Sequence, residues 1–309
     1  MIDVVAVGEI LMDLIATRKE VSLFDAPSFT PFPGGAPANV AVGVQRWGKS
    51  AAFIGKVGRD DFGNGLRALL HQEGVEVRGL LDDPRLLTTV AFVALSATNE
   101  PHFAFSAGAH TNLAVTDLAL DLFREARIVH GGSVSLAHEP VRATTLAAWE
   151  LARQQGAICT YDVNWRPMLW PDVAAGLALT RQPLALVDVV KMNAAELRLL
   201  TEQSDLHAAL LALETTANVV AVTLGAQGCL YRFQGTITEV AAPPVATVVD
   251  TTGAGDAFMA ALLAGLTDQP QRMHAAAIGD LMARACRAGS LAVTRAGAMP
   301  SLPYAHELM

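Results

Sequence analysis

The chain has 309 residues, of which 52% are hydrophobic and 17% are charged, a balance typical of a folded enzyme and not of a disordered chain. Its net charge of −8 argues against general nucleic-acid binding, because phosphate backbones attract clustered lysine and arginine side chains. Its three cysteines are scattered and form no disulfide framework or metal motif, so we expect a cytoplasmic location. The N-terminus lacks a signal-peptide pattern, and no apolar run reaches the roughly 18 residues that a membrane span needs.

Short apolar segments alternate with alanine-rich amphipathic segments along most of the chain. This alternation predicts an α/β fold, with a largely parallel central sheet and helices on both of its faces. The predicted strands cover residues 4–7, 51–54, 128–130, 158–161, 187–190 and 219–223. The predicted helices cover residues 37–47, 62–73, 140–155, 194–201, 254–266 and 272–291.

Two segments, residues 14–32 and 88–106, interrupt this alternation. The second places β-branched and aromatic residues on both sides of Asn99-Glu100-Pro101, a pattern typical of a hairpin. We expect these segments to form a small β-sheet lid over a ligand crevice, or alternatively surface hairpins without that role. No inter-domain linker is visible, so residues 1–309 are expected to form a single domain.

The strongest motif is DTTGAGD at residues 250–256, which precedes a helical pattern. The small residues Gly253, Ala254 and Gly255 allow a sharp turn into a helix whose first N–H groups attract an anion such as a phosphate. Asp256 falls in the first turn, where a carboxylate can accept a proton from an attacking hydroxyl group. Its place near a helix N-terminus predicts a lowered pKa. The alternative is an aspartate that only caps the helix.

A second motif, GGAPAN, begins at Gly34. Gly34 and Gly35 allow a polar ligand to approach the backbone, and Asn39 can both donate and accept hydrogen bonds with hydroxyl groups. Asp13, shortly after the first strand, can accept bonds from hydroxyl groups. The alternative for Asn39 and Asp13 is a solvated side chain. The chain has no P-loop and no G-x-G-x-x-G motif, so a phosphate site must be built at the Gly253 turn.

These two motifs resemble the two signatures of the ribokinase (PfkB) family of sugar kinases. The first signature spans residues 34–58 and includes Asn39, Ala41, Gly48 and Gly58 at matching spacing, and the second spans residues 250–263. The resemblance implies a ribokinase-like fold and phosphoryl transfer from ATP to a sugar, with Mg²⁺ as cofactor. It also implies a homodimer formed through the lid.

The resemblance further implies a role for individual residues. Asp256 corresponds to the general base, and the turn before it to an anion hole made by Gly253, Ala254 and Gly255. The implied sugar ligands include Asp13, Gly34, Gly35, Asn39 and Phe103. The implied nucleotide-site residues are Asn193, Glu196, Thr223, Gly225 and Gly228. The residues implied to hold a monovalent cation such as K⁺ are Asp250, Thr252, Ala292, Gly297 and Ser301.

Some of these positions have local alternatives. Asn193 and Glu196 belong to an N-x-x-E element, which in the family organises Mg²⁺ and phosphates largely through water. Their alternative is a helix-entry asparagine beside a solvated glutamate, and the alternative for Thr223 is a local hydrogen bond.

Two further elements bear on the choice of sugar. Residues 161–170, YDVNWRPMLW, resemble an element of fructokinases and 2-keto-3-deoxygluconate kinases. In that element Arg166 would donate to a sugar hydroxyl or pair with a carboxylate, unless it forms a structural salt bridge. Residues 108–113, GAHTNL, resemble a bacterial fructokinase element with His110 in place of an acid. Fructose is therefore the first expectation and the keto acid the second. A nucleoside kinase and a catalytically silent sugar-binding protein are further alternatives.

Overall fold

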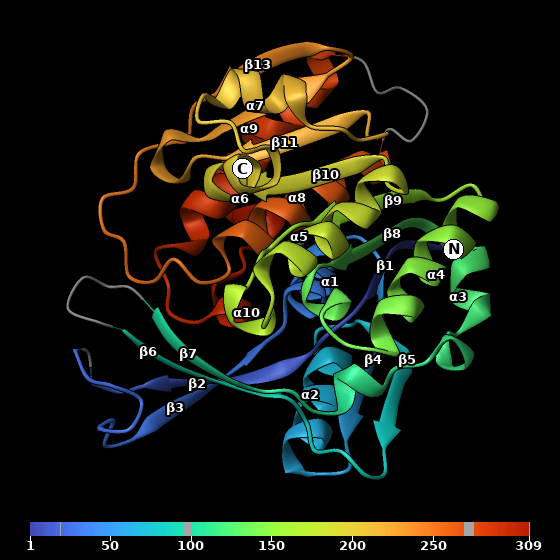
Figure 1. Ribbon diagram of the computed structural model, residues 1–309, viewed down its shortest axis with the longest axis vertical. Helices are drawn as coiled ribbons and strands as arrows, with labels where there is room; N and C mark the ends of the chain where they lie inside the picture. The colour runs from blue at the N-terminus through green and yellow to red at the C-terminus, as the bar shows by residue number, and fades with distance from the viewer. Residues whose placement is uncertain (19, 96–100, 269–274, 309) are drawn as a thin grey trace.

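The structure is a computed structural model that describes residues 1–18, 20–95, 101–268 and 275–308. A nine-stranded sheet forms the centre of the molecule (Figure 1). Its strand order is β13-β12-β11-β10-β9-β8-β1-β4-β5. Neighbouring strands from β11 to β5 are parallel, and β12 and β13 add antiparallel pairs at one edge. The strands are β1 (Ile2–Val7), β4 (Ala51–Gly58), β5 (Glu76–Asp83), β8 (Ala126–Gly132), β9 (Ile158–Asp162), β10 (Val189–Asn193), β11 (Val219–Thr223), β12 (Cys229–Phe233) and β13 (Thr236–Val240).

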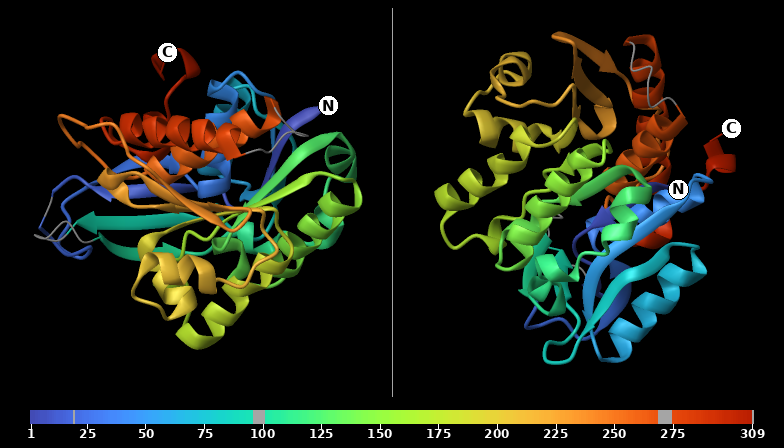
Figure 2. Two further views of the ribbon diagram at one scale, coloured as in Figure 1. Left: turned by 90° about the horizontal axis from the view of Figure 1, so that it is seen from above. Right: turned by 90° about the vertical axis from the view of Figure 1, so that its right-hand side faces the viewer.

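Helices cover both faces of this sheet, as its apolar sequence requires (Figure 2). Successive residues of β1 point to opposite faces, so Val4 packs in one core cluster with α1, α2, α8 and α9, and Val5 packs in the other with α3, α4, α6 and α7. Among the described residues, no helix is long and apolar enough to cross a membrane. The helices are α1 (Ala36–Arg46), α2 (Asp61–Gln72), α3 (Leu120–Glu125), α4 (Val141–Gln154), α5 (Val173–Arg181), α6 (Ala194–Thr201), α7 (Leu206–Ala212), α8 (Ala254–Asp268), α9 (Ala275–Ala292) and α10 (Ala298–Ser301).

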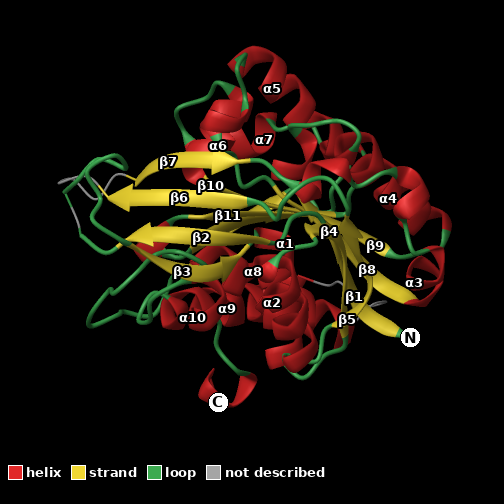
Figure 3. Cartoon of the chain, turned by 90° about the horizontal axis from the view of Figure 1, so that it is seen from below, coloured by secondary structure: helices red, strands yellow, loops and turns green. Residues whose placement is uncertain are grey.

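A second, four-stranded sheet has the order β3-β2-β6-β7 and extends to one side of the central sheet (Figure 3). The predicted hairpin in residues 88–106 is confirmed, because β6 (Val90–Leu95) and β7 (Pro101–Ser106) pair antiparallel. Of the turn predicted at residues 99–101, residues 99 and 100 lie outside the described residues, and Pro101 instead begins β7. The strands β2 (Leu11–Ala16) and β3 (Phe29–Gly34) complete the sheet, and β2 pairs in parallel with β6.

The predicted α/β fold and every predicted element are confirmed, with the bounds of β11 and α6 as predicted; residues 272–274 of the last helix lie outside the described part. The predicted elements did not include the helices α3, α5, α7 and α10 or the strands β5, β12 and β13. The last two join through Gln234 and Gly235, both with positive φ, in a tight turn that suits an antiparallel pair. Gln-Gly is a weaker sequence signal for such a turn than Asn-Gly or Asp-Gly.

Candidate functional site

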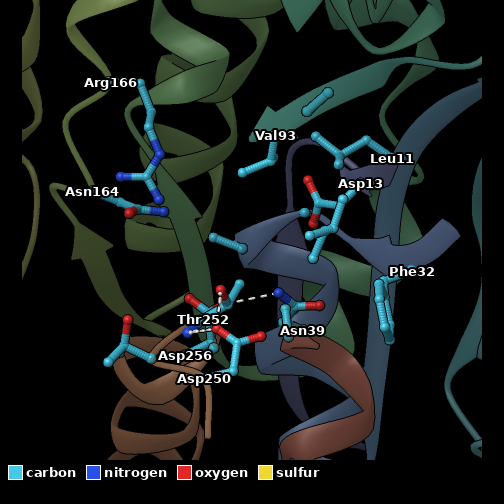
Figure 4. A pocket seen from close by; sticks show the side chains of 18 of the residues that line it. Leu11, Asp13, Phe32, Asn39, Val93, Asn164, Arg166, Asp250, Thr252 and Asp256 are labelled. Carbon is cyan, nitrogen blue, oxygen red and sulfur yellow. Dashed lines mark hydrogen bonds between the residues drawn. The ribbon is translucent and has the colours of Figure 1, made fainter. Parts of the chain in front are cut away.

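A cavity of about 1050 Å³ lies where the carboxyl ends of the central parallel strands meet the four-stranded sheet (Figure 4). In open α/β sheets this edge is where ligands bind. The cavity reaches from the small sheet to the ends of β10 and β11 and to the start of α8. Its polar lining includes Glu9, Asp13, Asn39, Arg166, Lys191 and Asp256.

The DTTGAGD segment forms the turn into α8, as predicted. Gly253 has φ +83°, and an added Cβ atom would lie 2.8 Å from the carbonyl oxygen of Ala298, so a larger residue does not fit. The first N–H groups of a helix have no partner within it and carry the positive end of the helix dipole. Gly253 and Gly255 line the cavity, so this turn can receive an anion there.

Asp256 lies in the first turn of α8 and is buried. Its Oδ2 accepts a hydrogen bond of 2.7 Å from Nδ2 of Asn39, which comes from α1. The expectation of a lowered pKa is wrong. Burial raises the pKa of Asp256 to about 6, because the loss of water destabilises the charged form. The hydrogen bond from Asn39 and the charges of nearby cations stabilise the charged form by a smaller amount. The carboxyl group is still mostly ionised at pH 7.

The GGAPAN segment forms the turn into α1, beside two acidic side chains. Gly34 packs directly against the carboxylate of Asp13, and Gly35, at φ +103°, packs against the backbone of Glu9. Glu9 Oε1 accepts a hydrogen bond of 3.2 Å from the backbone N–H of Ala36. Burial raises the pKa of both Glu9 and Asp13 to about 7.

The sequence-based list missed Glu9, although its position one residue after Gly8 at the end of the first strand was a usable signal. Lys191 was missed as well, since it lies one residue beyond the predicted strand 187–190, inside β10, and belongs to no motif.

Arg166 reaches into the cavity from the side opposite Asp13, with Asn39 and Asp256 at the floor (Figure 4). Its Nη1 donates a bond of 3.2 Å to the carbonyl oxygen of the neighbouring Trp165. Within the described ranges it forms no ion pair, so the structure does not support the alternative of a salt bridge there. Its positive charge opposes the rise in the pKa of Glu9, Asp13 and Asp256.

Asn193 and Glu196 form a reciprocal cap at the start of α6. The backbone N–H of Glu196 donates to Asn193 Oδ1 at 2.9 Å, and that of Asn193 donates to Glu196 Oε2 at 2.7 Å. Glu196 Oε1 accepts a further bond of 2.8 Å from the backbone N–H of Trp165. Glu196 is therefore buried with both oxygens occupied, and the alternative of a solvated glutamate is wrong. Asn193 lines the cavity, while Glu196 supports it from behind.

The remaining nucleotide-site candidates lie around the end of β11. Thr223 lines the cavity and donates a long bond of 3.4 Å to the carbonyl oxygen of Met192, so its hydroxyl has the local partner given as the alternative. Gly225 and Gly228 lie in the turn to β12 at φ +61° and +103°. An added Cβ on Gly228 would collide with the backbone of Val240, which explains the glycine structurally.

The five candidate cation-site residues come from two segments that meet beside the α8 turn: the loop before α8, and the segment that runs from the end of α9 to α10. Asp250 Oδ1 accepts bonds from the N–H and hydroxyl of Thr252, and its Oδ2 accepts a bond of 2.9 Å from the N–H of Gly297. Ser301 donates to the carbonyl oxygen of Ala298, and the carbonyl oxygen of Ala292 accepts a bond from Arg295. Among the described residues, no three His, Cys, Asp or Glu side chains gather as metal ligands.

Phe103, the remaining candidate, pairs through its backbone with Val93 in the small sheet. Its side chain lies outside the described part of the chain. Val93 itself lines the cavity.

Comparisons with known proteins agree over the whole chain. Residues 1–305 match the pfkB family of carbohydrate kinases. Fructokinase-2 of Solanum lycopersicum is 38% identical over 99% of this chain and 94% of its own length. A double mutant of Vibrio cholerae O395 fructokinase, solved with fructose, ADP and potassium ion, is 32% identical with a TM-score of 0.90, covering 99% of this chain and 96% of that one. Salmonella enterica aminoimidazole riboside kinase, solved with its riboside and an ATP analogue, is 30% identical with a TM-score of 0.86, over 99% and 98% of the two chains.

The raised pKa of Glu9 predicts a pH-dependent gain in stability for Glu9→Gln. A carboxyl group whose folded-state pKa is about 7 instead of 4.5 stabilises the fold fully below pH 4.5, and this contribution disappears as the pH rises through 7. Glutamine stays neutral and keeps an oxygen for the Ala36 N–H. Between pH 5 and pH 8, the unfolding free energy of the variant relative to wild type should rise by about 1–3 kcal/mol in urea titrations.

Glu307→Gln is the matched control. Arg295 and the backbone N–H of Tyr304 lower the pKa of Glu307 to about 2, so this variant should lose stability equally at pH 5 and pH 8. A stability difference for Glu9→Gln that does not change with pH would contradict the assignment.

Proposed function

The chain belongs to the pfkB family of carbohydrate kinases, and from this premise we propose that it transfers the γ-phosphoryl group of ATP to fructose, giving fructose 6-phosphate. The observation that carries the proposal is the buried Asp256 at the start of α8, in a cavity that also contains Asp13 and Arg166. The fructokinases of tomato and Vibrio cholerae support it through their similarity along the whole chain.

In the proposed mechanism, Asp256 is the general base. Its carboxylate accepts the proton of the attacking sugar hydroxyl, and a pKa near 6 makes it a stronger base than an ordinary aspartate while it stays ionised at neutral pH. Asn39 holds one carboxylate oxygen, which leaves the other to face the sugar. The N–H groups of Gly253, Ala254 and Gly255 stabilise the charge on the transferring phosphoryl group.

The sugar lies between the small sheet and the α1 turn in this proposal. The carboxylates of Asp13 and Glu9 accept bonds from hydroxyl groups, and the backbone at Gly34 and Gly35 permits their close approach. Arg166 donates from the opposite side, and Phe103 belongs to the strand that covers the pocket.

The nucleotide extends toward the ends of β10 and β11, past Asn193 and Thr223. A Mg²⁺ ion that accompanies ATP fits this end only through water and phosphate oxygens, because both oxygens of Glu196 are already bonded to the backbone. The loops at Asp250 and Gly297 supply oxygens for a monovalent cation, and the potassium ion in the Vibrio cholerae relative supports this assignment. We also place the enzyme in the cytoplasm, since its three cysteines are free and buried.

We prefer fructose to 2-keto-3-deoxygluconate because acidic side chains line the part of the cavity that Arg166 enters. A carboxylate substrate would lie near the acidic side chains Glu9, Asp13 and Asp256. Arg166, which has no carboxylate partner among the described residues, is the cation available to pair with it there. A nucleoside substrate has specific support from the riboside kinase relative.

A substrate panel decides between these candidates. With ATP and Mg²⁺, and ADP release as the readout, kcat/KM for fructose should exceed that for the keto acid and for a purine nucleoside by at least about tenfold. Arg166→Lys should keep a substantial part of the activity toward fructose, since a lysine can still donate to a hydroxyl group. A preference of the wild-type enzyme for the keto acid or the nucleoside would overturn the fructose assignment.

Asp256→Asn should lower kcat by about 10²–10⁴, the usual contribution of a positioned base. The amide oxygen can still accept the Asn39 bond, so the fold and ATP affinity should change little, as checked by thermal melts and nucleotide titration. Asp268→Asn, at the other end of α8, is the control and should keep wild-type turnover, because Asp268 pairs with Lys49 at the surface and does not line the cavity. Near wild-type turnover in Asp256→Asn would remove Asp256 from the mechanism.

We further propose that residues 1–309 form one kinase domain, with the small sheet as a lid and as the interface of a homodimer. Leu11, Asp13 and Ile15 of β2 line the cavity, so the alternate residue Leu14 points to the other face. Leu14 pairs there with Phe92 of β6, and the ring of Phe92 contacts that of Phe29 at 5.6 Å between centroids. A second copy of the same apolar face would cover these side chains.

Sedimentation of the wild-type protein should give a dimer, and Phe92→Glu should shift it toward a monomer of 32.5 kDa. The reason is that a charge on the outer face of the lid would be buried without a partner. Leu211→Glu, at a residue of α7 that is 64% exposed, is the control and should leave the mass unchanged. A wild-type monomer in dilute solution would rule the dimer out.

A further inference from the structure

A buried ion pair lies directly under the turn into α8. Lys191 of β10 and Asp162 of β9 are partners in the sheet register, and Lys191 Nζ lies 2.9 Å from Asp162 Oδ2. Their side chains are only 7% and 1% exposed. Burying two charges costs several kcal/mol that an apolar pair would avoid, so such a pair often has a role beyond stability.

The ammonium group of Lys191 reaches the residue that precedes the proposed base. A Cβ atom placed on Gly255 would lie 2.6 Å from Lys191 Nζ, so glycine at this position leaves the space that the ammonium group occupies. Lys191 also lines the cavity beside Gly255 and Asp256. A fixed positive charge thus lies at the base of the turn that would receive the phosphoryl group.

The groups that face Lys191 come from every element around it. Asp162 and Glu196 approach from β9 and α6, Asp256 from α8 and the neutral His130 from β8. Burial favours the uncharged amine, but these carboxylates outweigh it and raise the pKa of Lys191. Glu196 is already bonded to the backbone, so Asp162 is the direct counter-charge of Lys191.

We infer that Lys191 is a positioning residue for phosphoryl transfer, whose charge offsets the negative charge that gathers at the Gly255 turn. The charge of Lys191 also opposes the rise in the pKa of Asp256, an effect smaller than that of burial. This inference rests on the proposed function. A preorganised charge in a dry site acts strongly on developing charge, because no water has to reorient around it. Asp162 acts in the opposite direction on Asp256 and holds the lysine in place.

Opposite shifts in the pH profiles of two variants test this inference. Lys191→Met should lower kcat by about 10–100-fold and move the acidic limb of kcat/KM upward by about one pH unit, because Asp256 loses a nearby cation. Asp162→Asn leaves the ammonium group in place, so its acidic limb should move downward and most of kcat should remain. If the pair were only structural, both variants would lose stability, and the acidic limbs of their kcat/KM profiles would not shift in opposite directions.

The double variant Lys191→Met/Asp162→Asn separates loss of function from loss of folding, because it leaves no unpaired buried charge. It should melt near the wild-type temperature while its kcat stays low. The matched control is Lys56→Met/Asp117→Asn, which removes a partly buried pair 2.6 Å apart, between β4 and the 3-10 helix Val115–Asp117, outside the cavity lining. That control should change neither kcat nor the pH profile.

The results separate the two proposals. A wild-type enzyme without turnover of any sugar in the panel would count against the proposed function alone. With an active wild type, the variants are assayed on the sugar it accepts. A folded double variant with kcat within about twofold of wild type would overturn the role of Lys191, as would an Asp162→Asn profile that does not move or moves upward.

Discussion

The hydrogen bond from Asn39 to Asp256 joins two helices whose first turns are 217 positions apart in the chain. Each helix follows a glycine turn, one beside Asp13 and the other beside Asp250. Close packing keeps the pair in register, because Gly43 of α1 leaves room for only the methyl group of Ala260 of α8. The distance between the Gly34 turn and the Gly253 turn therefore depends on this one contact and on the packing behind it. In-line phosphoryl transfer requires that kind of fixed spacing.

The cavity also holds acidic groups in an environment that disfavours their charge. Glu9, Asp13 and Asp256 all have a raised pKa, and burial is the largest cause in each case. Proteins of this kind trade stability for a preorganised site. The charge of Arg166 opposes this rise in pKa in all three groups, and that of Lys191 opposes it in Asp256.

At the end of β10, the residues that cap α6 also lie at the cavity or directly behind it. The N-x-x-E element caps α6, and the hydrogen bonds of that cap occupy both oxygens of Glu196. Glu196 can therefore influence a metal through water and through its charge near Lys191, but it is poorly placed as a direct ligand. Asp250 behaves similarly, since its oxygens bond Thr252 and Gly297 and so fix the loop beside Gly253.

Local patterns in the sequence determined the alternation of strands and helices, the hairpin of residues 88–106 and the two glycine turns. These features depend on the periodicity of side chains and on backbone sterics, both of which neighbouring residues encode. Tertiary structure alone decided the pKa of Asp256, which was expected to be low and is raised. Its value depends on how completely distant segments exclude water from the carboxylate, and a motif does not contain that information.

The same reason explains the two cavity residues that motif analysis missed. Glu9 follows the apolar strand β1, Lys191 lies within β10, and neither belongs to a motif. The contacts of Glu9 with Ala36, and of Lys191 with Asp162 and Gly255, exist only in the folded chain. Which residues face the cavity follows from strand order and register in the folded sheet. Long-range packing determines strand order and register, whereas local sequence patterns determine the conformation of each segment.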